Sequence, residues 1–179
     1  MLISEAGSIP AKVVKVDEAD DLALLKAEGI FAPLPITSSR SVKIESTVTT
    51  VGFANIGLQG FAPKLVKGKM AALSGVQGDP RFFQIDVLVP AGGSGGALMD
   101  ERGNVVGVVA AKLYAAVAPI TGGAPSENLN YAVKSSFLLS FLESTPEICA
   151  KLKEPNTKDR KFDDVVKSAE QAAVLVLAY

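Results

Sequence analysis

Short runs of β-branched and apolar residues, separated by turns rich in Gly, Pro and Asp, make up most of this 179-residue chain. The first two runs, residues 11–16 and 22–26, flank the acidic turn 17–21 and predict a hairpin. Beyond a stretch with two prolines at 30–39, further runs predict strands at 46–53, 64–73, 82–89, 97–99, 105–113 and 129–133. Short strands joined by turns, without alternating helices, indicate an antiparallel barrel or sandwich.

Helical periodicity begins only after residue 134. Ser135 or Ser136 can cap a helix that Pro146 stops. A second helix is expected from Thr157 or Lys158, and its buried face is predicted from apolar residues at i, i+3, i+4 and i+7, namely Phe162, Val165, Val166 and Ala169. The final apolar run, 174–179, predicts a strand. The chain is therefore expected to be all-β with C-terminal helices.

Composition narrows the class of protein. Hydrophobic residues make up 48% and charged residues 21%, which suits one or two compact units. With 18 basic and 19 acidic residues the net charge is −1, so we expect no nucleic-acid partner and no anionic membrane surface. No apolar run reaches the roughly 18 residues of a membrane span, and no signal peptide is visible. One cysteine, Cys149, and no histidine exclude an intramolecular disulfide and a Cys/His metal site, and no cofactor is expected.

The densest chemical signal is the loop Gly92–Gly96, with Ser94 at its centre. Glycines at a tight turn permit positive φ and let the N–H groups of Gly92 and Ser94 point at one spot, as an oxyanion hole requires. A nucleophile elbow of an α/β-hydrolase would need a helix and a later histidine, and neither follows. A phosphate-binding loop would need a Gly-Lys-Ser/Thr ending, which is also missing. A flexible glycine linker is disfavoured because apolar strands flank the loop on both sides.

Five blocks in order resemble the trypsin-like serine peptidases of chymotrypsin fold, most closely their HtrA-like branch. They are residues 11–26, 51–53 with 67–75, 84–86, 92–109 and 130–133. The resemblance implies a double β-barrel. Only twenty residues precede Asp21, so we expect the first barrel to be incomplete and the second to be complete. It further implies a remnant of the first barrel at 1–37, the second barrel at 38–134, and C-terminal helices with a terminal strand at 135–179.

The resemblance also assigns site residues. It implies that Ser94 is the nucleophile and that Asp21, in an Asp-Leu-Ala motif, orients the catalytic histidine. Gly92 and Ser94 supply the oxyanion-hole amides. Leu88, six residues before the serine, and Val108 are assigned to the substrate pocket, where an aliphatic or small apolar side chain is favoured. Gly93 departs from the family, which often has asparagine there.

The missing histidine leaves more than one function open. A serine hydroxyl needs a base, and in this family the histidine lies upstream of the aspartate. Our first hypothesis is a serine endopeptidase domain that acts on polypeptides but is nearly inert as this fragment. The second is a non-catalytic pseudopeptidase used as a protein-binding module. A third, a Ser/Lys dyad with Lys69 or Lys112, lacks any sign of a desolvated lysine.

An incomplete barrel exposes unpaired backbone. We therefore expect residues 2–35 to pair with another chain, as in a homo-oligomer, or with the strand 174–179. The resemblance implies a periplasmic or secreted location.

Overall fold

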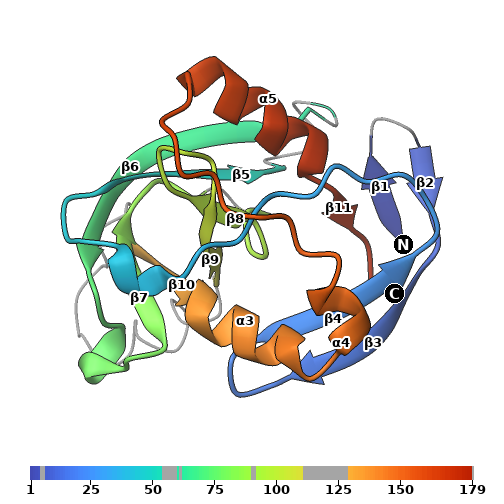
Figure 1. The fold of residues 1–179 in the computed structure, drawn as a ribbon, viewed down its shortest axis with the longest axis horizontal. Helices are drawn as coiled ribbons and strands as arrows, with labels where there is room; N and C mark the ends of the chain where they lie inside the picture. Colours follow the sequence, from blue (N-terminus) through green and yellow to red (C-terminus); the bar gives the residue numbers. More distant parts are fainter. Residues whose placement is uncertain (5–6, 54–59, 61, 90–91, 111–128, 179) are drawn as a thin grey trace.

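The computed structural model describes residues 1–4, 7–53, 60, 62–89, 92–110 and 129–178. Its centre is a closed six-stranded antiparallel barrel with the order β10-β7-β6-β5-β8-β9 (Figure 1). The strands are β5 (Thr47–Gly52), β6 (Lys64–Ala72), β7 (Phe82–Asp86), β8 (Ala97–Met99), β9 (Val105–Val109) and β10 (Leu129–Lys134). The predicted second barrel is therefore confirmed as a closed barrel.

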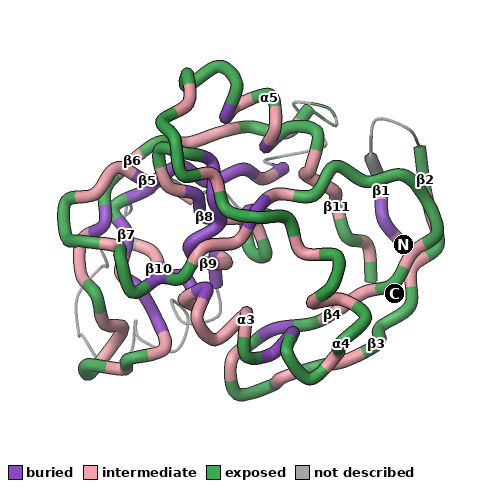
Figure 2. Tube along the Cα trace, viewed as in Figure 1, coloured by how far each residue is buried: buried purple, intermediate pink, exposed green. Residues whose placement is uncertain are grey.

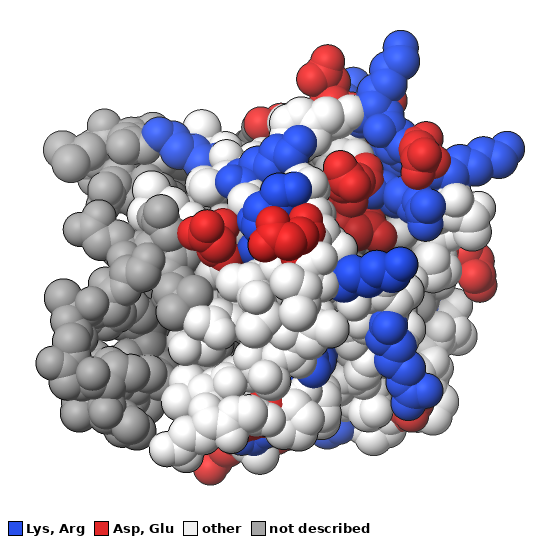
Figure 3. Space-filling view, turned by 90° about the vertical axis from the view of Figure 1, so that its left-hand side faces the viewer, with Lys and Arg blue, Asp and Glu red and all other residues white. Residues whose placement is uncertain are grey.

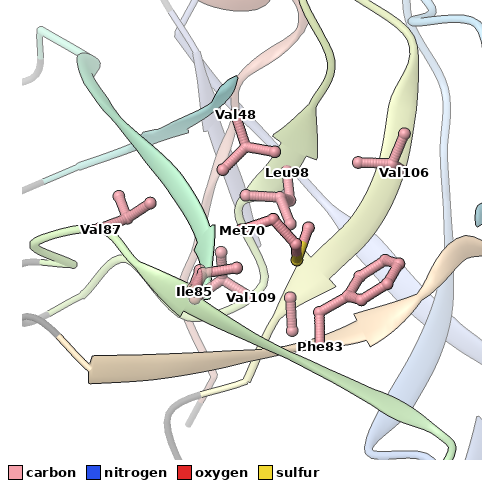
Figure 4. Close-up of a cluster of buried hydrophobic side chains, with 9 residues drawn as sticks. Val48, Met70, Phe83, Ile85, Val87, Leu98, Val106 and Val109 are labelled. Carbon is pink, nitrogen blue, oxygen red and sulfur yellow. The ribbon is translucent and has the colours of Figure 1, made fainter. Parts of the chain in front are cut away.

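Alternating side chains of these strands fill the barrel. Figure 4 shows them converging from β5, β6, β7, β8 and β9, and the burial along the same strands is visible in Figure 2. The cluster comprises Val48, Met70, Phe83, Ile85, Val87, Leu98, Val106, Val109 and Ala132, all at most 2% exposed. Burial of this many apolar side chains, each contributing about 1.5–3 kcal/mol, makes the barrel the stable base on which the site is built.

The N-terminal part forms two small sheets outside the barrel. β3 (Ala11–Asp17) and β4 (Leu22–Ala27) pair as the predicted hairpin. β1 (Leu2–Ser4) pairs with β2 (Gly7–Ile9) on one side and with β11 (Leu175–Val176) on the other. The expectation that the N-terminal segment would pair with the terminal strand is thus met for Leu2 and Ile3.

Three helices follow the barrel. α3 (Ser135–Glu143) and the short α4 (Pro146–Cys149) lie between the barrel and the hairpin, and α5 (Phe162–Ala172) crosses the outside of β5 and β8 (Figure 1). Val165 and Ala169 of α5 are buried, the latter against Val51, Met99 and Val105. The helix therefore covers the outer face of the barrel beside the Ser94 loop.

The last part of the chain departs from the sequence expectation at several points. Phe162, expected on the buried face of the second helix, is 47% exposed. α5 begins at Phe162, not near residue 157, and the preceding segment is bound to the barrel by two hydrogen bonds between Asn156 and the Asn104 side chain. Pro146 does not only end α3; it also opens α4 as its first residue. Ser135 is fully buried and donates to the Thr37 carbonyl at 2.6 Å, so it anchors the helix and does not cap it.

Candidate active site

Ser94 stands at the tip of a tight turn. The N–H of Gly96 donates to the carbonyl of Gly93 at 3.2 Å, which places Ser94 and Gly95 at the two central positions. Gly95 has φ +81°, the value that the third residue of a type II turn requires. Because the turn is this tight, the serine side chain is exposed and accessible to a substrate.

Backbone contacts on two sides fix this turn. Gly95 donates to the Val109 carbonyl at 2.8 Å, and Val109 donates back to the Gly96 carbonyl at 2.9 Å. On the other side the loop packs on the end of β5, where a Cβ on Gly96 would lie 2.3 Å from the Val51 oxygen. The loop is thus held by β9 and β5 together, and at Gly96 there is no room for a side chain larger than hydrogen.

The amides at the start of the loop remain available for a ligand. Within the described part of the chain, the N–H groups of Gly92, Gly93 and Ser94 donate to no protein acceptor, whereas those of Gly95 and Gly96 are both engaged. Gly92 has φ +91°, a conformation that side chains rarely adopt. Chemically, the arrangement offers an exposed hydroxyl with unengaged N–H donors close to it in the chain, among them the predicted pair Gly92 and Ser94.

Asp21 lies in the turn between β3 and β4. The turn is closed by the Asp17 carboxylate, which accepts from the amides of Ala19 and Asp20 at 3.0 and 3.1 Å. Asp21 itself has φ +51°. The next residue, Leu22, is buried and packs in a cluster with Ala110. Ala110 directly follows Val109, which binds the Ser94 loop, so this cluster lies next to the part of β9 that holds the loop.

Arg81 fastens the same turn to the barrel. Its guanidinium donates to the Ala19 carbonyl and lies 3.6 Å from the Asp20 carboxylate. It also pairs with Asp79 at 2.6 Å. The side-chain hydrogen bond from Arg81 lowers the pKa of Asp79, and the same bond raises the pKa of Arg81. Arg81 therefore helps to position the Asp21 turn. The sequence did not predict this contact, because Arg81 and Ala19 are 62 residues apart.

Neither of the two residues assigned to a substrate pocket is among the described residues that line the cavity containing Ser94. Leu88 follows β7 and is 55% exposed. Val108 is half-buried and packs with the cluster that faces α3. The cavity that does contain Ser94 has a volume of about 280 Å³. One side of it is formed by residues 51–53 and 92–97, and the other by residues 172–176.

Lys69 and Lys112 are the two candidates for a Ser/Lys dyad. Lys69 donates to the Glu45 carbonyl at 3.2 Å and to the Thr47 hydroxyl at 3.3 Å, and Lys112 lies outside the described residues. Among the residues that the structure describes, no group of three His, Cys, Asp or Glu could hold a metal ion, and no helix is long and apolar enough to cross a membrane. Basic and acidic side chains are interspersed on the face in Figure 3.

Comparison with known proteins gives the context of this site. An uncharacterised protein, y4bJ, of Sinorhizobium fredii is 36% identical over 76% of this chain and 21% of its own length. A Pseudomonas putida protein named "Probable periplasmic serine endoprotease DegP-like" is 32% identical over 59% of this chain and 22% of its own. The serine protease Do-like HtrA of Lactococcus lactis is 27% identical over 91% of this chain and 41% of its own.

The chain therefore spans about a fifth of the length of the first two of these relatives. The family model of the trypsin-like peptidase domain matches residues 4–108, which include the hairpin, most of the barrel and the Ser94 loop. The resemblance read from the five sequence blocks is confirmed by this match. The chain belongs to the trypsin-like peptidase domain family.

Proposed function

We propose that this chain is the nucleophile-bearing part of a serine endopeptidase. Ser94 attacks the peptide carbonyl, and the amides of Gly92 and Ser94 stabilise the tetrahedral oxyanion. The observation that carries the proposal is the exposed Ser94 turn, in which the amides of Gly95 and Gly96 are engaged while those of Gly92 and Ser94 are not. Membership of the trypsin-like family supplies the reaction class.

The base is the part that these 179 residues do not contain. They include no histidine, so an imidazole that takes the Ser94 proton must come from outside them. In this proposal Asp21 orients that imidazole, and the turn that carries it is fastened by Arg81 and Leu22. We expect the chain alone to be nearly inert, since loss of the base costs on the order of 10⁴- to 10⁶-fold in rate.

Acylation of Ser94 tests the proposal. The purified chain is incubated with p-nitrophenyl acetate, with and without added imidazole, and the acetylated residue is located by mass spectrometry of peptides. We expect little acetylation without imidazole and selective acetylation of Ser94 with it. Ser94→Ala provides the blank for imidazole's own hydrolysis of the ester, and Ser41→Ala, another exposed serine, is the matched control. Equal acetylation of Ser94 and Ser41 would contradict the proposal.

A second candidate is a non-catalytic protein-binding module. Two observations favour it: the absence of histidine, and the segment 172–176 that closes one side of the Ser94 cavity. The acylation assay separates the candidates, because a pure binding module has no need of a Ser94 that reacts faster than Ser41.

The partners and location follow from the same proposal. The substrate is a polypeptide, in keeping with relatives named as serine endoproteases, and one relative is named as periplasmic. Leu88 and Val108 remain the proposed pocket for the side chain before the cleaved bond. We further propose that pairing with a second copy or another chain covers the open hairpin β3–β4.

A further inference from the structure

The segment that follows α5 runs as an extended strand beside the Ser94 loop. Ala173 ends the helix with ψ 133°, and β11 then pairs antiparallel with β1, Leu175 opposite Ile3 and Val176 opposite Leu2. The Leu177 N–H continues this pairing with a 2.8 Å bond to the Met1 carbonyl. Figure 1 shows β11 between β1 and the end of α5. The segment is thus bound through its backbone as well as its side chains.

The same segment separates two hollows. The first, about 280 Å³, contains Ser94. The second, about 870 Å³, is lined by β4, Phe31 and α4. Ala172, Val174 and Val176 line both, so the segment is the partition between them. Without it, the space beside Ser94 would open into the space under the hairpin.

Residues 173–178 and the described lining of the hollow beside Ser94 are both uncharged. Residues 173–178 read Ala-Val-Leu-Val-Leu-Ala, an uncharged run of strand-forming residues. The described residues that line the Ser94 hollow carry no charged side chain. A strand with backbone bonds to a sheet edge and alternate side chains in pockets is the usual mode of β-augmentation.

We propose that the edge of β1 and the hollow beside Ser94 form one groove for an extended apolar polypeptide, and that residues 173–178 occupy this groove in cis. Only the identification of this polypeptide as a substrate for Ser94 rests on the proposed function. The groove takes a second polypeptide when the segment leaves. Its apparent affinity in the intact chain is lowered by the fraction of time for which the groove is open.

Trans binding of the segment is the direct test. The probe is a fluorescein-labelled peptide of residues 174–179 with two added lysines for solubility, and its binding is followed by fluorescence anisotropy. A chain ending at Ala173 keeps α5 and its buried Val165 and Ala169, and we expect it to bind the peptide at least about tenfold more tightly than the intact chain does. A probe with Leu177→Pro lacks the N–H that bonds to Met1 and should bind far more weakly.

Point variants of the intact chain keep the test valid if the shortened chain fails to fold. Leu177→Pro in the chain should release the segment and raise affinity for the unaltered probe. Ala178→Pro, at an exposed position that follows the pairing residues, is the matched control and should leave the affinity for the probe unchanged. Equal affinity of Leu177→Pro and Ala178→Pro for the probe would overturn the inference. Dimerisation of the shortened chain without peptide binding would overturn it in favour of a second copy as occupant.

Failure here and failure of the proposed function give different results. If the probe does not bind but imidazole-dependent acetylation of Ser94 is seen, the inference of a groove is wrong and the proposed function stands. If the probe binds but Ser94 is no more reactive than Ser41, the groove stands as a binding site of a non-catalytic module.

Discussion

Replacement of Gly96 by alanine is the sharpest test of how the Ser94 loop is held. Gly96 lies between the Ser94 turn and β8, and its backbone faces β5. A Cβ there would lie 2.3 Å from the Val51 carbonyl oxygen and 2.9 Å from that of Gly93. Both contacts are with backbone, so neither can be relieved by rotation of a side chain. The loop must move away from β5.

The size of the effect can be estimated from these distances. An ordinary contact begins near 3.4 Å, so the Val51 overlap is about 1 Å and involves a strand of the closed barrel. Overpacking of this kind costs about 1–3 kcal/mol. Moving the loop also strains the bonds to Val109, each worth about 1 kcal/mol. We expect Gly96→Ala to lose about 2–4 kcal/mol, a fall in Tm on the order of 5–15 °C for a chain of this size.

Two other glycines provide matched controls. Gly95 and Gly78 both have positive φ, +81° and +79°, and a Cβ at either would meet no atom within 4 Å. Alanine at these positions pays only the left-handed backbone cost of about 1–2 kcal/mol. Calorimetry of the three variants, with imidazole-dependent acetylation of Ser94 as a second readout, tests the reasoning. A Gly96→Ala chain as stable as Gly78→Ala, with unchanged Ser94 acetylation, would refute it.

Three further substitutions test the packing of the hairpin, a buried hydroxyl and an ion pair. Leu22→Ala should lose about 2–5 kcal/mol, because it empties a buried position between the hairpin and the barrel, and hydrogen exchange should rise throughout the Asp21 turn. Thr50→Val should stabilise the chain by about 1 kcal/mol in denaturant melts, because among the described side chains the buried Thr50 hydroxyl has no hydrogen-bond partner. Asp79→Asn should lose less than about 1 kcal/mol at pH 7. Folding lowers the pKa of Asp79 from 3.8, so its stabilisation is present above that value and is lost as pH falls below it; the variant and the parent should therefore converge in acid melts.

The barrel was predictable from sequence because its signals are local. Each strand is a short apolar run between Gly, Pro or Asp turns, and the turn Asp100–Gly103 shows why this works. Asp100 accepts from the amides of Arg102 and Asn104 at 2.9 and 2.8 Å, so one side chain closes the connection. Likewise, the glycines around Ser94 indicate a backbone conformation that few other residues can adopt.

The parts that the sequence did not predict depend on contacts between distant segments. β1 is three residues long and gains its partners only when β2 and β11 meet it, so no periodicity marks it. The segment before α5 is bound by Asn104, whose side chain bonds to the backbone of Asn156 52 residues away. Arg81 reaches the Asp21 turn across 62 residues. A pattern confined to neighbouring residues cannot reveal any of these.

This difference between local and distant contacts bears on the function. The geometry of the Ser94 turn and of the Asp21 turn is maintained by backbone bonds, by Leu22 and by Arg81, none of which requires a catalytic base. Preservation of both turns is therefore expected of an endopeptidase and of a binding module alike. What distinguishes the two is the use of the unengaged amides of Gly92 and Ser94 and of the groove that residues 173–178 fill. A peptidase needs both at once on the same polypeptide, whereas a binding module needs only the groove, and so reactivity of Ser94 decides between them.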